Sequence, residues 1–128
     1  MLHPLTVLFS FYKRAALQGV PAALVALGKM HQDGRGIAVD NLLAAKLYAA
    51  AAESGFAQAQ VHLAHMYERG LGVQQDLKQA LQLFRAAADQ GLSEAFHHTG
   101  RMLEQGIGGQ VDLQAALRFF LFWCRAVC

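Results

Sequence analysis

The chain has 128 residues, which is enough for one compact domain with a real core and not for two. Hydrophobic residues make up 55% of it and charged residues 16%, and this composition excludes a disordered chain. The formal net charge is +2 and no run of Lys or Arg occurs, so we expect no nucleic-acid partner.

Residues 1–19 predict a single apolar helix. The basic pair Lys13-Arg14 follows the apolar run instead of preceding it, and no convincing cleavage site comes after it, so a signal peptide is disfavoured. The apolar run is also too short to span a bilayer. We therefore expect a cytoplasmic protein without a membrane span, and a periplasmic location is the alternative.

From residue 20 onward the sequence repeats with a period of 36 residues. The stretches GRGIAVD, GLGVQQD and GIGGQVD begin at Gly34, Gly70 and Gly106. Methionine, alanine and aromatic residues recur at the same period, which is the pattern of a repeat architecture. The repeat defines three units, which span residues 20–55, 56–91 and 92–128.

Each unit predicts two helices, named here helix A and helix B. Helix A carries apolar residues at helical spacing and ends at the first glycine of the repeated stretch, where a left-handed residue closes the helix. The aspartate that ends the stretch suits the N-cap of helix B, and a further glycine ends helix B. The N-cap aspartates are Asp40, Asp76 and Asp112. The glycines that end helix B are Gly19, Gly55 and Gly91. A phosphate-binding loop is disfavoured, because no strand precedes the glycines.

The combined pattern A-x-x-x-L-G-x-M-[YH]-x-x-G-x-G-[VI]-x-x-D, followed by an Ala-Ala pair and a glycine, closely resembles the Sel-one-like repeat, a relative of the tetratricopeptide repeat. The resemblance extends from Pro4 to Cys124. It implies an all-α, right-handed solenoid of about seven helices in a single domain, residues 1–128. In that domain residues 1–19 are an orphan helix B ahead of the three units.

The resemblance also implies a binding role for proteins or peptides, often as an adaptor in bacterial complexes. In tetratricopeptide relatives helix A lines the concave face, and its second, fifth, ninth and twelfth positions point outward. Transferring these positions predicts a partner-binding strip that suits a peptide with polar and apolar contacts; an ordinary solvated face is the alternative. Besides Ala22, the strip consists of Val25, Lys29, Gln32, Gln58, Val61, His65, Glu68, Glu94, His97, Arg101 and Glu104.

A zinc site is the more specific hypothesis for the six histidines, since His62, His65 and His98 fall on adjacent A helices. However, no carboxylate or cysteine completes the set in the repeat register, and adjacent helices lie roughly 10 Å apart. We therefore expect no metal and no cofactor.

Catalysis is not expected either. The serines lie on helix B or at helix ends, no nucleophile–base pairing is suggested, and the family has no common catalytic residues to carry over. We expect a non-catalytic interaction scaffold or adaptor. The alternative is a small inhibitor, immunity-type or regulatory protein that blocks an effector enzyme.

Both terminal helices carry more apolar bulk than one packed face needs. In the last helix Trp123 and Cys124 replace the small Ala-Ala pair of the other units, and Leu121 and Phe122 are larger than their counterparts. We expect one or both ends to be covered, by a homodimer through the C-terminal helix centred on Leu121, Phe122 and Trp123 or, as the alternative, by a partner protein. Cys124 and Cys128 are interpreted as reduced thiols, with a strained disulfide or a soft-metal pair as alternatives.

Overall fold

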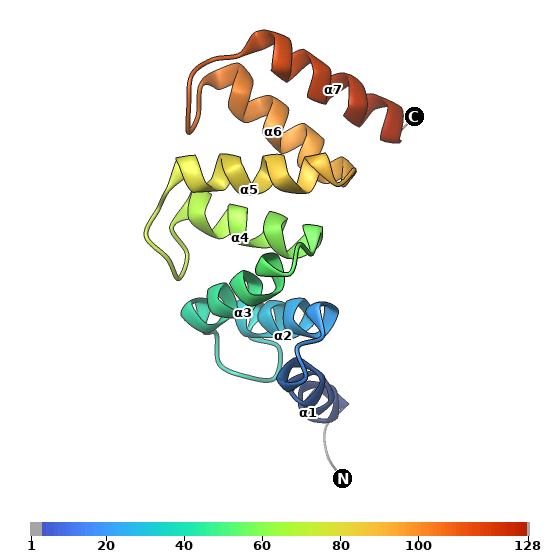
Figure 1. Ribbon diagram of the computed structural model, residues 1–128. Coiled ribbons are helices and arrows are strands. Elements are labelled where there is room, and N and C mark those ends of the chain that lie inside the picture. Colours follow the sequence, from blue (N-terminus) through green and yellow to red (C-terminus); the bar gives the residue numbers. More distant parts are fainter. Residues whose placement is uncertain (1–3, 128) are drawn as a thin grey trace.

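The computed structural model describes residues 4–127, and these residues form helices joined by short loops (Figure 1). In chain order the helices are α1 Pro4–Leu17, α2 Pro21–Asp33, α3 Asn41–Glu53, α4 Ala57–Arg69, α5 Leu77–Asp89, α6 Ser93–Gln105 and α7 Leu113–Val127. The prediction of an all-α repeat solenoid with seven helices is confirmed for the described residues.

The helices stack in sequence order from α1 at one end to α7 at the other (Figure 1). Each helix packs mainly against its predecessor and its successor, and α2 also contacts α4. Thus α2, α4 and α6 are the A helices, and α1, α3, α5 and α7 are the B helices. No helix in residues 4–127 is both long and apolar enough to cross a membrane.

Each A helix ends at a glycine in the left-handed region, as predicted. The φ angle is +71° at Gly34, +71° at Gly70 and +70° at Gly106. The N–H of each donates to the carbonyl of the methionine four residues earlier, so the glycine closes the last turn. The predicted aspartate caps are also present: the Asp76 carboxylate accepts the N–H of Gln79 at 3.1 Å, and the other two units repeat this bond.

The second glycine of each of the last two loops has a role that the sequence did not reveal. Gly72 lies against the backbone of Asn41 at the start of α3, and Gly108 lies against Leu77 at the start of α5. A Cβ atom at either position would overlap a backbone carbonyl. The second glycine therefore lets the loop of one unit pack closely on helix B of the preceding unit.

The core consists of small residues around one large aromatic side chain per unit. Tyr48 of α3 and Phe84 of α5 are fully buried, and alanines surround them. Phe120 is the counterpart on α7 and is only half-buried. Within residues 4–127 no further helix packs against α7 from outside, which explains the difference.

Candidate protein-binding face and its histidine cluster

Ten of the predicted strip residues lie at the surface of the A helices, and we call the nine of them other than Ala22 the helix-A face. It consists of the exposed residues Lys29, Gln58, Glu94, His97 and Glu104 and the half-buried residues Gln32, His65, Glu68 and Arg101. The helix-A face therefore carries side chains from α2, α4 and α6 and presents charges of both signs.

Val25 and Val61 do not belong to this face, and their prediction as exposed strip residues is wrong. Their side chains are 6% and 2% exposed and belong to the apolar core. They occupy the fifth helix position, which in these two units packs into the apolar clusters around Tyr48 and Phe84. His97 occupies the same position on α6 but remains exposed, because no further A helix follows among the described residues.

An ion pair joins two helices across the helix-A face. Arg101 of α6 donates through Nη2 to Oε2 of Glu68 of α4 at 2.6 Å, and the side chains are only 32% and 19% exposed. A short, half-buried pair between guanidinium and carboxylate is among the stronger polar contacts of a protein surface. It fixes two side chains of the helix-A face relative to each other.

Gln32, on the helix-A face, accepts a hydrogen bond from a buried side chain of the same unit. The Tyr48 hydroxyl donates to Oε1 of Gln32 at 2.9 Å. Burial, and secondarily the charge of Asp33, raise the pKa of Tyr48 well above its ordinary value, so the hydroxyl keeps its proton and remains a donor. One acceptor of Gln32 is therefore engaged before any partner binds.

The structure brings together a histidine–carboxylate cluster that was not expected from the sequence. One ligand atom each of His65, Glu94 and His98 lie within 4.8 Å of one another. Nε2 of His65 lies 4.0 Å from Oε1 of Glu94. The expectation that no carboxylate completes the set is wrong, because Glu94 lies one turn before His98 on α6 and reaches across to α4. Helix spacing alone underestimated the reach of these side chains.

The imidazoles of the cluster are kept neutral. Desolvation is the largest cause that lowers the pKa of His65. Desolvation, and then repulsion from His65 when it is protonated and from Arg101, lower the pKa of His98 to about 4. At neutral pH both rings therefore carry a lone pair.

The last helix presents the apolar surface that its sequence predicted. Leu121, Phe122 and Trp123 are between 36% and 54% exposed. Phe122 contacts Phe96 of α6, with ring centroids 5.7 Å apart, and Cys124 is exposed beside them. At the opposite end α1 exposes Val7, Leu8 and Phe11.

The predicted pairing alternatives for the two cysteines involve Cys128, which lies outside the described residues.

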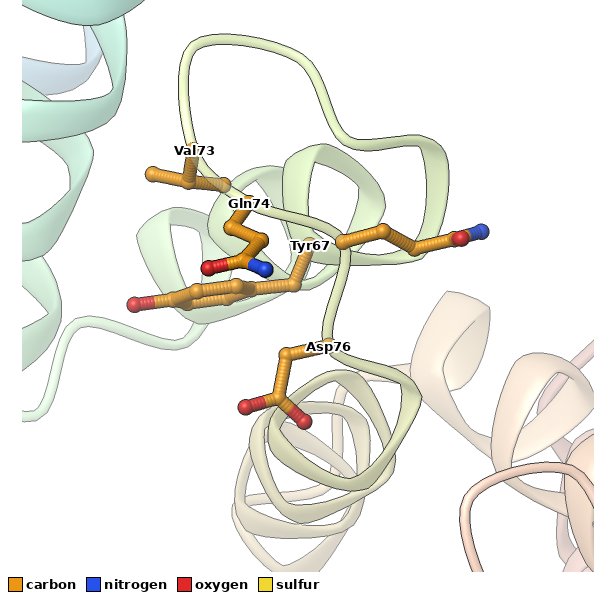
Figure 2. Close-up of a pocket in the computed structure, with 5 residues that line it drawn as sticks. Tyr67, Val73, Gln74 and Asp76 are labelled. Atoms are coloured by element: carbon orange, nitrogen blue, oxygen red, sulfur yellow. The ribbon is translucent and has the colours of Figure 1, made fainter.

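A hollow of about 510 Å³ lies at the loop between α4 and α5, and Figure 2 shows the residues around it. Two of its polar side chains already have partners within the fold. Asp76 caps α5, and Gln75 donates to the carbonyl of Glu68 at 2.8 Å. Asp76 is the single charged side chain among the five lining residues and is engaged as a cap, whereas the helix-A face carries several charged side chains.

Comparisons with known proteins agree with the repeat architecture. The family described as "Sel1 repeat" matches residues 9–20, 21–56, 57–92 and 93–126. No curated protein matches the chain.

Two solved structures are similar over most of the chain. The crystal structure of a Sel1 repeat protein from Oxalobacter formigenes shares 32% identity, with a TM-score of 0.82 over 84% of this chain and 44% of that one. The second is c5321, a protective antigen present in uropathogenic Escherichia coli strains displaying an SLR fold. It shares 36% identity, with a TM-score of 0.88 over 92% of this chain and 25% of that one. The chain thus spans less than half the length of either protein.

Proposed function

Because the chain belongs to the Sel1 repeat family, we propose that it binds a partner protein or peptide through the helix-A face and catalyses no reaction. Proteins of this family are generally helical scaffolds that mediate protein–protein interactions, typically without catalysis. The observation that supports the choice of surface is the row of polar and charged side chains on three successive A helices, part of it held in place by the Arg101–Glu68 pair.

The chemistry of the helix-A face favours a segment that carries charges of both signs. Lys29 lies on α2, and the exposed acids Glu94 and Glu104 lie on α6. A basic group of the partner would pair with the α6 end and an acidic group with the α2 end. Pairs of this kind contribute to specificity and to the rate of association more than to affinity.

An inhibitor or immunity-type protein remains the alternative function, and it would use the same face. The two functions differ in what the partner is: a scaffold joins proteins into a complex, whereas an inhibitor lowers the activity of an effector enzyme. An activity assay of the captured partner, with and without this chain, distinguishes them.

The surface is tested by affinity capture with two charge-balanced variants as baits. Lys29→Glu with Glu104→Lys changes the helix-A face, and Lys46→Glu with Glu53→Lys makes the same change on α3, outside it. All four side chains are exposed, so both variants are expected to fold. We expect a partner that is recovered by the wild type and the α3 variant but lost with the helix-A variant. Equal recovery by all three baits contradicts the assignment of the face.

A further inference from the structure

The histidine–carboxylate cluster on α4 and α6 has the donor set of a metal site. Zinc binds imidazole nitrogen and carboxylate oxygen, and two histidines with one glutamate is an established ligand set that leaves a fourth position open. In tetrahedral zinc sites neighbouring ligand atoms are about 3.3 Å apart. From the present separation of at most 4.8 Å, a movement of about 1.5 Å or less brings the ligands to that spacing.

The Glu94 side chain can make this movement while the two imidazoles stay in place. The Glu94 side chain is 60% exposed, so it can change rotamer without disturbing the core. The two imidazoles are held by Phe84: the His98 ring stacks on it at 4.9 Å, and the His65 ring meets it edge-on at 5.0 Å. The rigid nitrogen ligands thus lie in place, and the flexible oxygen ligand supplies the adjustment.

The two rings also have nitrogens without hydrogen-bond partners. Nδ1 of His65 and Nδ1 of His98 are buried and accept or donate no hydrogen bond among residues 4–127. Nδ1 of His65 faces the Glu68 carboxylate, so Nε2, which faces Glu94, is the nitrogen of this ring on the side of the cluster. For the buried Nδ1 of His98, an ion is one established cause of a missing partner.

A second layer of charged groups supports the cluster. Oε1 of Glu68 lies 3.8 Å from Nδ1 of His65, and Arg101 holds Glu68 from the other side at 2.6 Å. Carboxylates behind ligating histidines orient the ring and raise its basicity. The pairing with Glu68 also offsets the positive charge of Arg101, which would otherwise repel a cation.

The preceding unit provides an internal comparison. His62 stacks on Tyr48 at 4.9 Å, as His98 stacks on Phe84. One period before His65 and Glu94, however, the chain has Lys29 and Gln58, which supply neither an imidazole nitrogen nor a carboxylate oxygen. The same backbone arrangement therefore occurs twice, and only one copy carries three ligands.

We propose that His65, Glu94 and His98 bind one divalent transition-metal ion, with zinc as the expected ion, on the helix-A face. The fourth coordination position faces solvent at the exposed Glu94 side, where water or a side chain of another protein completes the site. The proposal does not depend on the partner, because the three ligands come from this chain alone.

The experiment measures zinc binding to the full chain without a histidine tag, by equilibrium dialysis with the metal quantified in each compartment. Co²⁺ absorption in the visible range reports the coordination geometry. We expect one ion per chain. We also expect Glu94→Gln, His65→Gln and His98→Gln each to weaken binding at least about tenfold, the lower end of the effect of losing even an outer-shell partner.

Two controls separate this site from other zinc ligands. His62→Gln removes the stacked histidine of the preceding unit and should leave binding unchanged. Cys124→Ser with Cys128→Ser removes the cysteines and should also leave it unchanged. Glu94→Gln is the decisive variant, because its side chain is 60% exposed and the variant is expected to fold, which circular dichroism would check. Absence of bound zinc, wild-type affinity of Glu94→Gln, or loss of zinc in the double serine variant overturns the proposal.

Discussion

At Gly72 the chain needs glycine for two separate reasons. Its φ angle is +70°, and a Cβ atom would overlap the backbone of Asn41. Gly55 has a φ angle of +86°, but a Cβ there would meet nothing within 4 Å. Comparison of the two positions therefore separates the cost of backbone conformation from the cost of contact between units.

We expect Gly72→Ala to lower the free energy of unfolding more than Gly55→Ala does. Both variants incur about 1–2 kcal/mol for the left-handed backbone. Gly72→Ala must in addition displace the loop from α3, which adds at least about 1 kcal/mol. Urea denaturation followed by circular dichroism measures both. Equal losses would show that the loop moves away from Asn41 at no cost.

His98 makes stability depend on pH in the acidic range. Its pKa is about 4 in the folded chain, below the ordinary value of 6.5, with Arg101, His65 and His97 acting against protonation and Glu94 for it. Between these values the unfolded chain binds the proton more readily. The free energy of unfolding that depends on a neutral His98 is therefore fully present above about pH 6.5. It is lost as the pH falls from there towards 4.

We therefore expect the melting temperature of the metal-free chain to fall between pH 7 and pH 5, and to fall less in His98→Gln. A residual slope should remain in this variant, because the pKa of His65 is lowered as well. Scanning calorimetry in the presence of a chelator measures the melting temperatures of the wild type and of His98→Gln at each pH. Parallel decreases in the two proteins would exclude His98 as a source of the pH dependence.

At the scale of the helix, the A helices of neighbouring units share a backbone arrangement and differ in side chains. If the metal proposal is correct, ligands moved by one period should produce a second site. We expect Lys29→His with Gln58→Glu, next to the native His62, to raise the zinc stoichiometry from one to two. Lys29→His alone supplies only two ligands, the new histidine and His62, and should leave the zinc stoichiometry at one. A stoichiometry that stays at one in the double variant contradicts the role of this arrangement.

At the scale of the whole molecule, the two ends of the solenoid expose apolar side chains that internal helices cover. We propose that α7 self-associates through Leu121, Phe122 and Trp123, since aromatic clusters of this kind are frequent centres of interfaces. Light scattering should show a dimer at high micromolar concentration. Phe122→Glu with Trp123→Glu should give a monomer, whereas Val7→Glu with Phe11→Glu on α1 should not. A monomeric wild type, or a dimeric α7 variant, contradicts this surface.

The sequence alone determined the number of helices, the glycines that end the A helices and the aspartates that cap the B helices. Gly70 ends α4 and Asp76 begins α5 through bonds between residues three or four positions apart, and the energy of such bonds depends on local conformation. Repetition at a fixed period then made the solenoid the consistent solution, because each unit buries its apolar face only against its neighbours.

The tertiary structure alone decided which side chains meet between units. Val61 is buried and His97 is exposed at the same helix position, since only the former has a further A helix beside it. His65 and Glu94 are 29 positions apart in the sequence, and their approach depends on how α6 lies on the helices before it. A repeat pattern fixes the period but not the angle between successive helices, and this angle sets the contacts across the helix-A face.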